Sequence, residues 1–150
     1  MPLIMETPEN INDLVKDANC KHCWTTRLSA LNELKKYDCT QSRDVIKRLA
    51  LHDKVFKVKE EAVRATQLLN IKKDGKPISL GKKNTGYKPK EITKLFLRVK
   101  SESKIENFEL SEFKDFFKNL DPEMFDVMNF EKRDKFDSWI ENMFRGLPNK

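Results

Sequence analysis

Residues that break helices are scarce in this sequence. Its 150 residues include only 4 glycines and 6 prolines, too few for the frequent turns of a protein built from many short strands. No run of eighteen apolar residues exists, so we expect no membrane-spanning helix. The first ten residues, MPLIMETPEN, lack the basic start and the apolar core of a signal peptide. With an odd number of cysteines, 3, these absences favour a helical, cytoplasmic protein without a disulfide framework.

Basic charge is concentrated in the middle of the chain. Residues 71–104 contain 11 Lys or Arg and 3 Asp or Glu, which gives them a net charge of +8. Residues 1–70 contain 12 Lys or Arg and 10 Asp or Glu, a net charge of +2, and residues 105–150 contain 7 and 11, a net charge of −4. The whole chain therefore carries a net charge of +6. This density of basic residues makes an anionic partner worth considering. A solvated basic surface without a partner is the alternative.

Apolar residues recur in the first half of the chain at a step of 34 positions. At this step, Trp24, Leu28, Leu31 and Leu34 are followed by Val58, Ala62, Ala65 and Leu68. Asn19 matches Asp53 in the same way, and both are residue types that cap helices. The recurrence predicts two copies of one helical element.

A further helix is predicted between the two copies. One helical face carries Val45, Ile46, Leu49 and Ala50. Ser42 is the predicted N-cap of this helix. We therefore expect three helices joined by two short turns.

The stretch HDKVFKVKEEAVRATQLL, residues 52–69, has an Asp, then a Val with a basic residue, then a small-residue helix that ends in Leu. The positions that carry this pattern are Asp53, Val58, Lys59, Ala62, Ala65 and Leu68. The pattern resembles the HEAT-like (armadillo-type, PBS-lyase-like) helical repeat family, and NCKHCWTTRLSALNEL, residues 19–34, is a weaker copy. The resemblance covers about residues 10–70 and implies stacked helical hairpins, which the rest of the chain or a partner must cap. An unrelated helical bundle is the alternative.

Residues 71–90 are predicted to form a connector, because they contain three of the four glycines. The connector is basic, because it also contains seven lysines. Asp74 and Gly75 predict a β-hairpin turn. The candidate binding residues of this region and the helix after it are Lys72, Lys73, Lys76, Lys82, Lys83, Tyr87, Lys88, Lys90, Arg98 and Lys100. The basic residues could contact phosphates and Tyr87 could stack on a base, whereas a solvated linker is the alternative. A nucleotide-hydrolysing phosphate loop is excluded, because Lys82 is followed by Lys83 and not by Ser or Thr.

Residues 91–150 are predicted to form a second helical unit. Its apolar stripes consist of Ile92, Leu95, Phe96 and Val99, then Leu110, Phe113, Phe117 and Leu120, then Phe136, Ile140, Met143 and Phe144. Ser111 and Asp121 are the predicted caps of two helices. Phenylalanine at helical spacing predicts a core. A helix-turn-helix with residues 122–128 as the reading helix is disfavoured, because Glu123 and Asp126 would face phosphates.

The sequence offers no convincing catalytic or metal-binding motif. Cys20, His22 and Cys23 form one half of a zinc-type cluster, but Cys39 and His52 are isolated and no second close pair exists. Redox chemistry of a C-x-x-C motif needs a preceding strand, which is not predicted here. We therefore expect no metal and no cofactor.

The sequence as a whole predicts an all-α protein. Residues 1–70 form the HEAT-like repeats, residues 71–90 the basic connector, and residues 91–150 a C-terminal helical unit packed on the repeats. The favoured function is non-catalytic binding of a protein partner, as an adaptor or regulator. The alternative is binding of DNA or RNA through residues 72–100, and an enzyme that modifies DNA is a third, less favoured class. A continuous basic groove would favour nucleic acid, and an exposed apolar groove on the repeats would favour protein.

Overall fold

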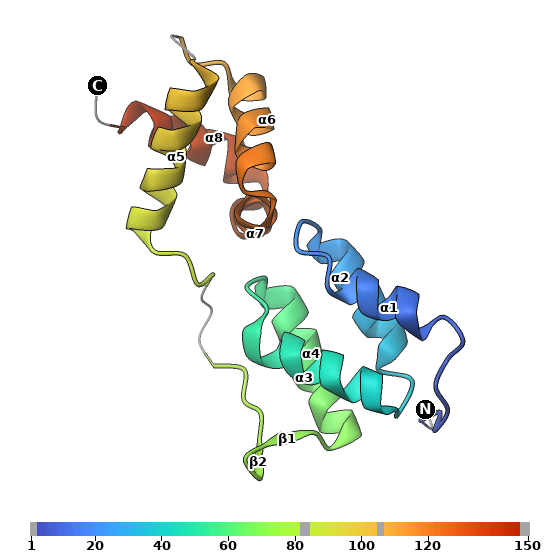
Figure 1. Ribbon diagram of the computed structural model, residues 1–150. Helices are drawn as coiled ribbons and strands as arrows, with labels where there is room; N and C mark the ends of the chain where they lie inside the picture. Colours follow the sequence, from blue (N-terminus) through green and yellow to red (C-terminus); the bar gives the residue numbers. More distant parts are fainter. Residues whose placement is uncertain (1–2, 82–84, 105–106, 148–150) are drawn as a thin grey trace. The chain divides into compact units, whose positions relative to one another are not determined.

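The computed structural model describes residues 3–81, 85–104 and 107–147, and it is all-α with one small β-hairpin, as the sequence predicts (Figure 1). The chain divides into two compact units, residues 1–84 (unit 1) and residues 85–150 (unit 2). The division falls within the predicted connector. No helix in the described ranges is long and apolar enough to cross a membrane.

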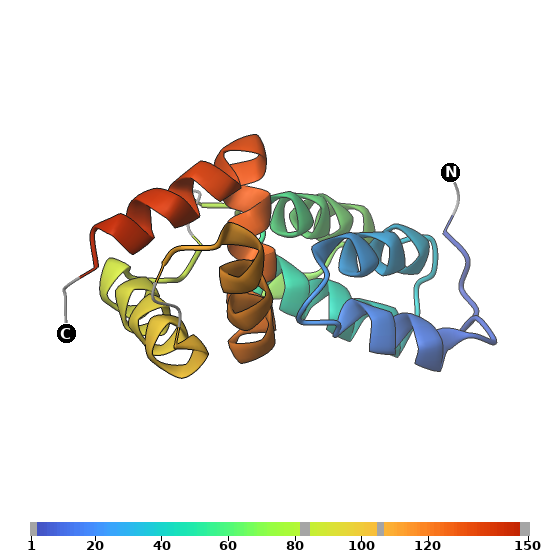
Figure 2. The same ribbon diagram turned by 90° about the horizontal axis from the view of Figure 1, so that it is seen from above.

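Unit 1 is a pair of stacked helical hairpins followed by a short β-hairpin. Its elements are α1 (Ile11–Ala18), α2 (Trp24–Leu34), α3 (Thr40–His52), α4 (Phe56–Leu69), β1 (Lys72–Lys73) and β2 (Lys76–Pro77). Each helical hairpin packs internally, α1 on α2 and α3 on α4. Between the hairpins, α1 lies against α3 and α2 lies against α4. The helices therefore form two layers, with α1 and α3 in one and α2 and α4 in the other (Figure 2).

The prediction of three helices did not include α1, which completes the first helical hairpin. Ile11, Leu14 and Ala18 are buried, and Val15 is half-buried. Their spacing of three and four residues is the signal that could have revealed this helix.

Burial repeats between α2 and α4, but at a step of 35 positions and not 34. Arg27, Ala30, Leu31 and Leu34 are the buried residues of α2, and Ala62, Ala65, Thr66 and Leu69 are buried at the corresponding positions of α4. The predicted match of Leu34 with Leu68 is therefore wrong by one position, because Leu34 is fully buried whereas Leu68 is exposed. The prediction placed Leu68 in the core, whereas the structure places it at the surface.

The start of α3 differs from the prediction. The N-cap is Cys39, and Ser42 lies inside the first turn. The Ser42 hydroxyl accepts a hydrogen bond from the Cys39 backbone N–H and donates one to the Tyr37 carbonyl. Ser42 thus stabilises the turn before α3 from within the helix, and its side chain is fully buried.

Ala62 lies where α4 packs against its neighbours, and its side chain is fully buried. We expect Ala62→Leu to lower the free energy of unfolding by about 1–3 kcal/mol, because extra methylene groups overfill a packed contact. Urea denaturation measures the loss. Ser29→Leu, at an exposed position of α2, is the control that adds a leucine without overfilling the core. Equal stability of the two variants would show that α4 is not closely packed at Ala62.

The β-hairpin confirms the predicted turn. Asp74 and Gly75 have positive φ angles of 52° and 77°, the pattern of a two-residue hairpin turn that matches the strand twist. Asn70 ends α4 in the left-handed conformation, and the Ile71 N–H donates to the Thr66 carbonyl. Ile71 and Ile78, just outside the two strands, are both buried. The base of the hairpin is therefore anchored in unit 1.

Unit 2 is a helical unit with an aromatic core. Its elements are α5 (Pro89–Ser103), α6 (Leu110–Leu120), α7 (Pro122–Lys132), the 3-10 turn η1 (Arg133–Lys135) and α8 (Phe136–Arg145). Phe96, Phe113 and Phe117 are fully buried, and the ring of Phe96 meets those of the other two edge-on. The predicted phenylalanine core is therefore present.

The predicted N-cap is confirmed for α7 and is wrong for α6. The Asp121 carboxylate accepts from the Met124 N–H, and Pro122 occupies the first position of α7, as predicted. At α6 the N-cap is Glu109, whose carboxylate accepts from the Ser111 N–H. The prediction of Ser111 as the cap is wrong, because α6 begins at Leu110 and Ser111 lies inside its first turn, where its backbone N–H is the donor to the cap.

Candidate functional site

The side of α4 that faces away from α3 carries an exposed apolar residue among charged ones. Leu68 is 64% exposed, although it lies in a regular helix whose other leucine, Leu69, is buried. Arg64 and Gln67 are also exposed, one turn before and next to Leu68. We call the surface formed by the exposed Arg64, Gln67 and Leu68 and the half-buried Glu60 and Glu61 the α4 face.

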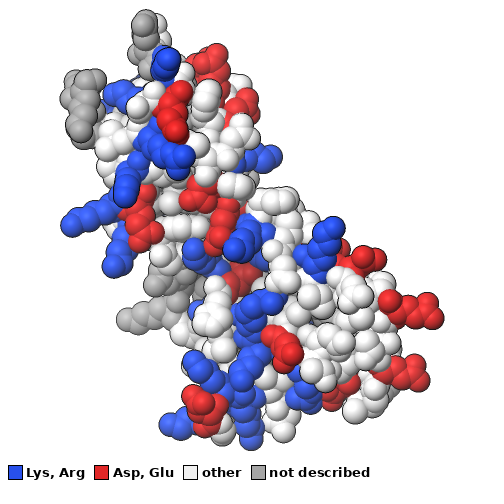
Figure 3. Space-filling model, viewed as in Figure 1, with Lys and Arg blue, Asp and Glu red and all other residues white. Residues whose placement is uncertain are grey.

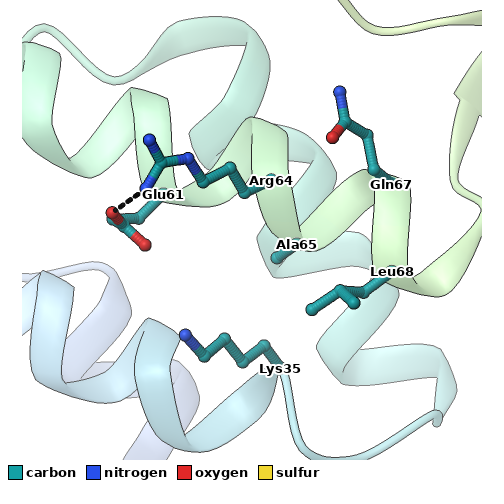
Figure 4. Close-up of a pocket in the computed structure, with 6 residues that line it drawn as sticks. All are labelled: Lys35, Glu61, Arg64, Ala65, Gln67 and Leu68. Atoms are coloured by element: carbon teal, nitrogen blue, oxygen red, sulfur yellow. Dashed lines mark hydrogen bonds and ion pairs between the residues drawn. The ribbon is translucent and has the colours of Figure 1, made fainter.

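One groove runs between the α4 face and the end of α2. Its lining residues are Lys35, Glu61, Arg64, Ala65, Gln67 and Leu68, and its volume is about 420 Å³. Figure 4 shows Ala65 and Leu68 directed toward Lys35 across the groove, with Arg64 beside Glu61. The groove therefore has an apolar floor, with Lys35 on one side and the ion pair of Arg64 and Glu61 on the other.

A second groove lies on the other side of α4, against the segment that follows the β-hairpin. It is lined by Glu60, Val63, Arg64, Gln67, Pro77, Ile78, Ser79 and Leu80, and its volume is about 510 Å³. Val63 and Ile78 are buried beneath it, at 5% and 6% exposure. Arg64 and Gln67 line both grooves. The α4 face is thus a ridge with an apolar hollow on each side.

The charged residues of the α4 face form ion pairs with one another. The Arg64 guanidinium lies 3.1 Å from Glu61 and 3.9 Å from Glu60, and Lys57 lies 3.3 Å from Glu61. The Arg64 side chain is 64% exposed, whereas those of Glu60 and Glu61 are 29% and 16% exposed. The Arg64 side chain is therefore accessible to an acidic group of a partner, while the carboxylates beside it are half-buried.

The ten candidate binding residues, nine basic residues and Tyr87, are divided between the two units. Lys72, Lys73 and Lys76 lie on the β-hairpin of unit 1, and all three are exposed. Lys82 and Lys83 lie outside the described residues. The remaining five, Tyr87, Lys88, Lys90, Arg98 and Lys100, belong to unit 2.

Two of the basic residues in unit 2, Arg98 and Lys100, interact with other side chains of that unit. The Arg98 guanidinium lies 2.9 Å from the Glu102 carboxylate. The Lys100 ammonium lies 5.4 Å from the centre of the Phe144 ring, a distance at which the cation and the ring attract each other. Lys88 and Lys90 are exposed at the start of α5. Among the described residues, Lys88 and Lys90 therefore resemble the three hairpin lysines in belonging to no ion pair.

Tyr87 is half-buried beside α5. It lines a hollow of about 270 Å³ together with Glu91, Lys94, Leu95, Arg98, Asp121 and Met124. Acidic and basic side chains alternate around this hollow, so it favours neither an anion nor a cation. The ring of Tyr87 is not presented as an open surface for base stacking.

The cysteine and histidine residues form no metal site within the described ranges. The Cys20 sulfur lies 3.6 Å from the ring nitrogens of His22. The Cys23 sulfur instead accepts a hydrogen bond from Thr26 at 3.1 Å at the start of α2. In the part of the chain that the structure describes, no group of three or more His, Cys, Asp or Glu could hold a metal ion.

Comparison with protein-family models, with curated proteins and with solved structures found no match for this chain. Inference of function therefore rests on the surfaces of the two units. On the α4 face of unit 1, an exposed apolar side chain lies at a groove.

Proposed function

We propose that this protein is a non-catalytic adaptor or regulator that binds a protein partner on the α4 face, with unit 1 acting as a short HEAT-like helical stack. The observation that carries the proposal is the exposure of Leu68, 64%, at the first groove, with the second groove on the other side of α4. Apolar grooves rimmed by polar side chains are typical of interaction surfaces, and Leu68 adds exposed apolar area to the first of them. A surface of this kind on the repeats is the feature that favours a protein partner over a nucleic acid.

The chemistry of the α4 face also indicates the kind of segment that it accepts. A partner would place apolar side chains in the two grooves and an acidic side chain near Arg64 and Lys35, which border the first of them. An amphipathic helix meets both needs, because its apolar residues recur at three and four positions with acids beside them. We therefore expect an acidic, amphipathic segment in the partner.

We expect Leu68→Asp to weaken partner binding by about 2 kcal/mol, roughly thirty-fold in Kd, because a central apolar anchor is lost and a charge is introduced. The partner is found by affinity capture from nuclease-treated lysate with the full chain. Its affinity for the wild-type protein and the variant is then measured by titration. Leu68 is on the surface, so the variant should keep the thermal stability of the wild type.

Met5→Asp is the matched control, because Met5 is 72% exposed and apolar but does not belong to the α4 face. The partner is the protein that the wild type and Met5→Asp retain and that Leu68→Asp loses. If every captured protein is retained equally by all three forms, the α4 face is not a binding surface.

A further inference from the structure

The net positive charge of the protein belongs entirely to unit 1. Residues 1–84 contain 17 Lys or Arg and 11 Asp or Glu, whereas residues 85–150 contain 13 of each. Five of the 17 basic residues of unit 1 take part in ion pairs, namely Arg27, Lys36, Arg43, Lys57 and Arg64. The lysines of the β-hairpin belong to none of the ion pairs among the described residues. Figure 3 shows Lys and Arg side chains gathered over the part of unit 1 where α3, α4 and the hairpin lie.

The β-hairpin holds two of these lysines directly opposite each other. Its register pairs Lys73 with Lys76 across the turn. Residues paired in this way lie about 5 Å apart at their Cβ atoms, and like charges at such positions destabilise a hairpin. An anion that lies between the two ammonium groups would remove this repulsion. The pair is therefore better suited to a bound anion than to free solvent.

The hairpin presents these lysines from an anchored base. Ile71 and Ile78 are 7% and 6% exposed, so both ends of the hairpin are held in unit 1. The two-residue turn at Asp74 and Gly75 leaves few alternative conformations between the strands. Fewer degrees of freedom are then lost when the lysines contact a ligand.

We propose that the hairpin contacts the phosphate backbone of duplex nucleic acid through Lys72, Lys73 and Lys76, at a site separate from the α4 face. Lysine binds phosphate as a compact positive charge, and a two-stranded ribbon is narrow enough to enter the major groove of a duplex. The proposed contacts are to phosphates, which carry no sequence information. We therefore expect binding to be independent of sequence.

Two other anionic partners fit the hairpin less well. Single-stranded nucleic acid is bound by proteins that stack bases on aromatic rings, and the hairpin has no aromatic residue. A membrane surface is bound most firmly when apolar side chains enter the lipid beside the basic ones. The tip of the hairpin offers only polar residues, Lys73, Asp74, Gly75 and Lys76.

The test is a salt titration of the full chain on a fluorescent DNA duplex of mixed sequence. We expect Lys73→Gln combined with Lys76→Gln to reduce the slope of log affinity against log salt by about 2, because each lost phosphate contact removes roughly 0.9. Lys16→Gln combined with Lys21→Gln is the matched control. Both of those lysines are exposed in unit 1 away from the hairpin, so the control removes the same charge and should keep the wild-type slope.

Three results would overturn the proposal: no binding of the wild type to the duplex at about 50 mM salt, an equal loss of slope in both double variants, or binding to phosphatidylserine vesicles in place of the duplex. Leu68→Asp should bind the duplex as the wild type does. A loss of partner binding without a loss of duplex binding thus separates this site from the α4 face. Thermal melts of both double variants should match the wild type, because all four lysines are exposed.

Discussion

Replacing Asp53 with alanine is expected to lower the free energy of unfolding of unit 1 by about 3–5 kcal/mol, the cost of breaking a buried ion pair by removing one partner. The Arg27 guanidinium donates to both oxygens of the Asp53 carboxylate, from Nε at 2.9 Å and from Nη2 at 3.2 Å. The two side chains are only 8% and 3% exposed. A third donor of Arg27 bonds the Cys20 carbonyl, and Asp53 also accepts from the Val55 N–H. The pair thus links α2 to the turns that precede α2 and α4.

The matched control is an exposed ion pair of the same unit. Glu33 and Lys36 lie 3.0 Å apart with side chains 41% and 50% exposed, so Glu33→Ala should cost less than about 1 kcal/mol. Urea denaturation in a Trp139→Phe background, followed by the fluorescence of Trp24, reports on unit 1 alone. A loss in Asp53→Ala no larger than in Glu33→Ala would show that the buried pair does not hold the two hairpins together.

Replacing Phe96 with alanine is expected to cost unit 2 about 3–5 kcal/mol. Its ring is fully buried, and it meets the rings of Phe113, Phe117 and Trp139 with centres 5.1 to 5.4 Å apart. Removal of the ring leaves a cavity at a point where α5, α6 and α8 converge. The neighbouring rings are too rigid to fill this cavity, so most of the transfer energy and of the aromatic contacts is lost.

Phe116→Ala is the control for Phe96, because Phe116 is 38% exposed on the neighbouring helix α6. We expect this variant to lose much less stability than Phe96→Ala. Denaturation in a Trp24→Phe background, followed by the fluorescence of Trp139, reports on unit 2. If the two variants lose equal stability, the aromatic residues around Phe96 are not the core of the unit.

Most helices were predictable because their periodic residues are also their buried residues. In α3, Val45, Ile46, Leu49 and Ala50 form one face in the sequence and are all buried in the structure. The hairpin turn was predictable for a different reason, since the pair Asp74–Gly75 tolerates the positive φ angles that a two-residue turn requires.

The sequence could not predict contacts that depend on how the hairpins stack. Arg27 lies at a charged position of an amphipathic helix, which ordinarily faces solvent. It is buried because stacking brings it to Asp53, 26 positions away in the chain. Likewise, Cys39 and Glu109 cap helices although neither is among the preferred capping residues. Their local backbone conformation, set by the preceding turn, decides where the helix begins.

The candidate site was the least predictable part of the protein. A periodic leucine near the end of a small-residue helix predicts a core position, and only the burial of neighbouring Leu69 reveals that Leu68 faces outward. The two grooves are formed by residues from α2, α4 and the segment after the hairpin. No local pattern brings these segments together. By contrast, the turn predicted at Asp74 and Gly75 lies between Lys73 and Lys76, which pair across the hairpin in the structure.

The most direct test of partner binding on the α4 face is site-specific photo-crosslinking of the full chain. A photoreactive amino acid is placed at Gln67, an exposed position that lines both grooves, and in a second variant at Lys16, an exposed position of α1. We expect a crosslinked protein partner from position 67, absent from position 16 and lost when Leu68→Asp is added. The same crosslinked proteins from both positions, or a crosslink from position 67 that persists with Leu68→Asp, would contradict partner binding on the α4 face.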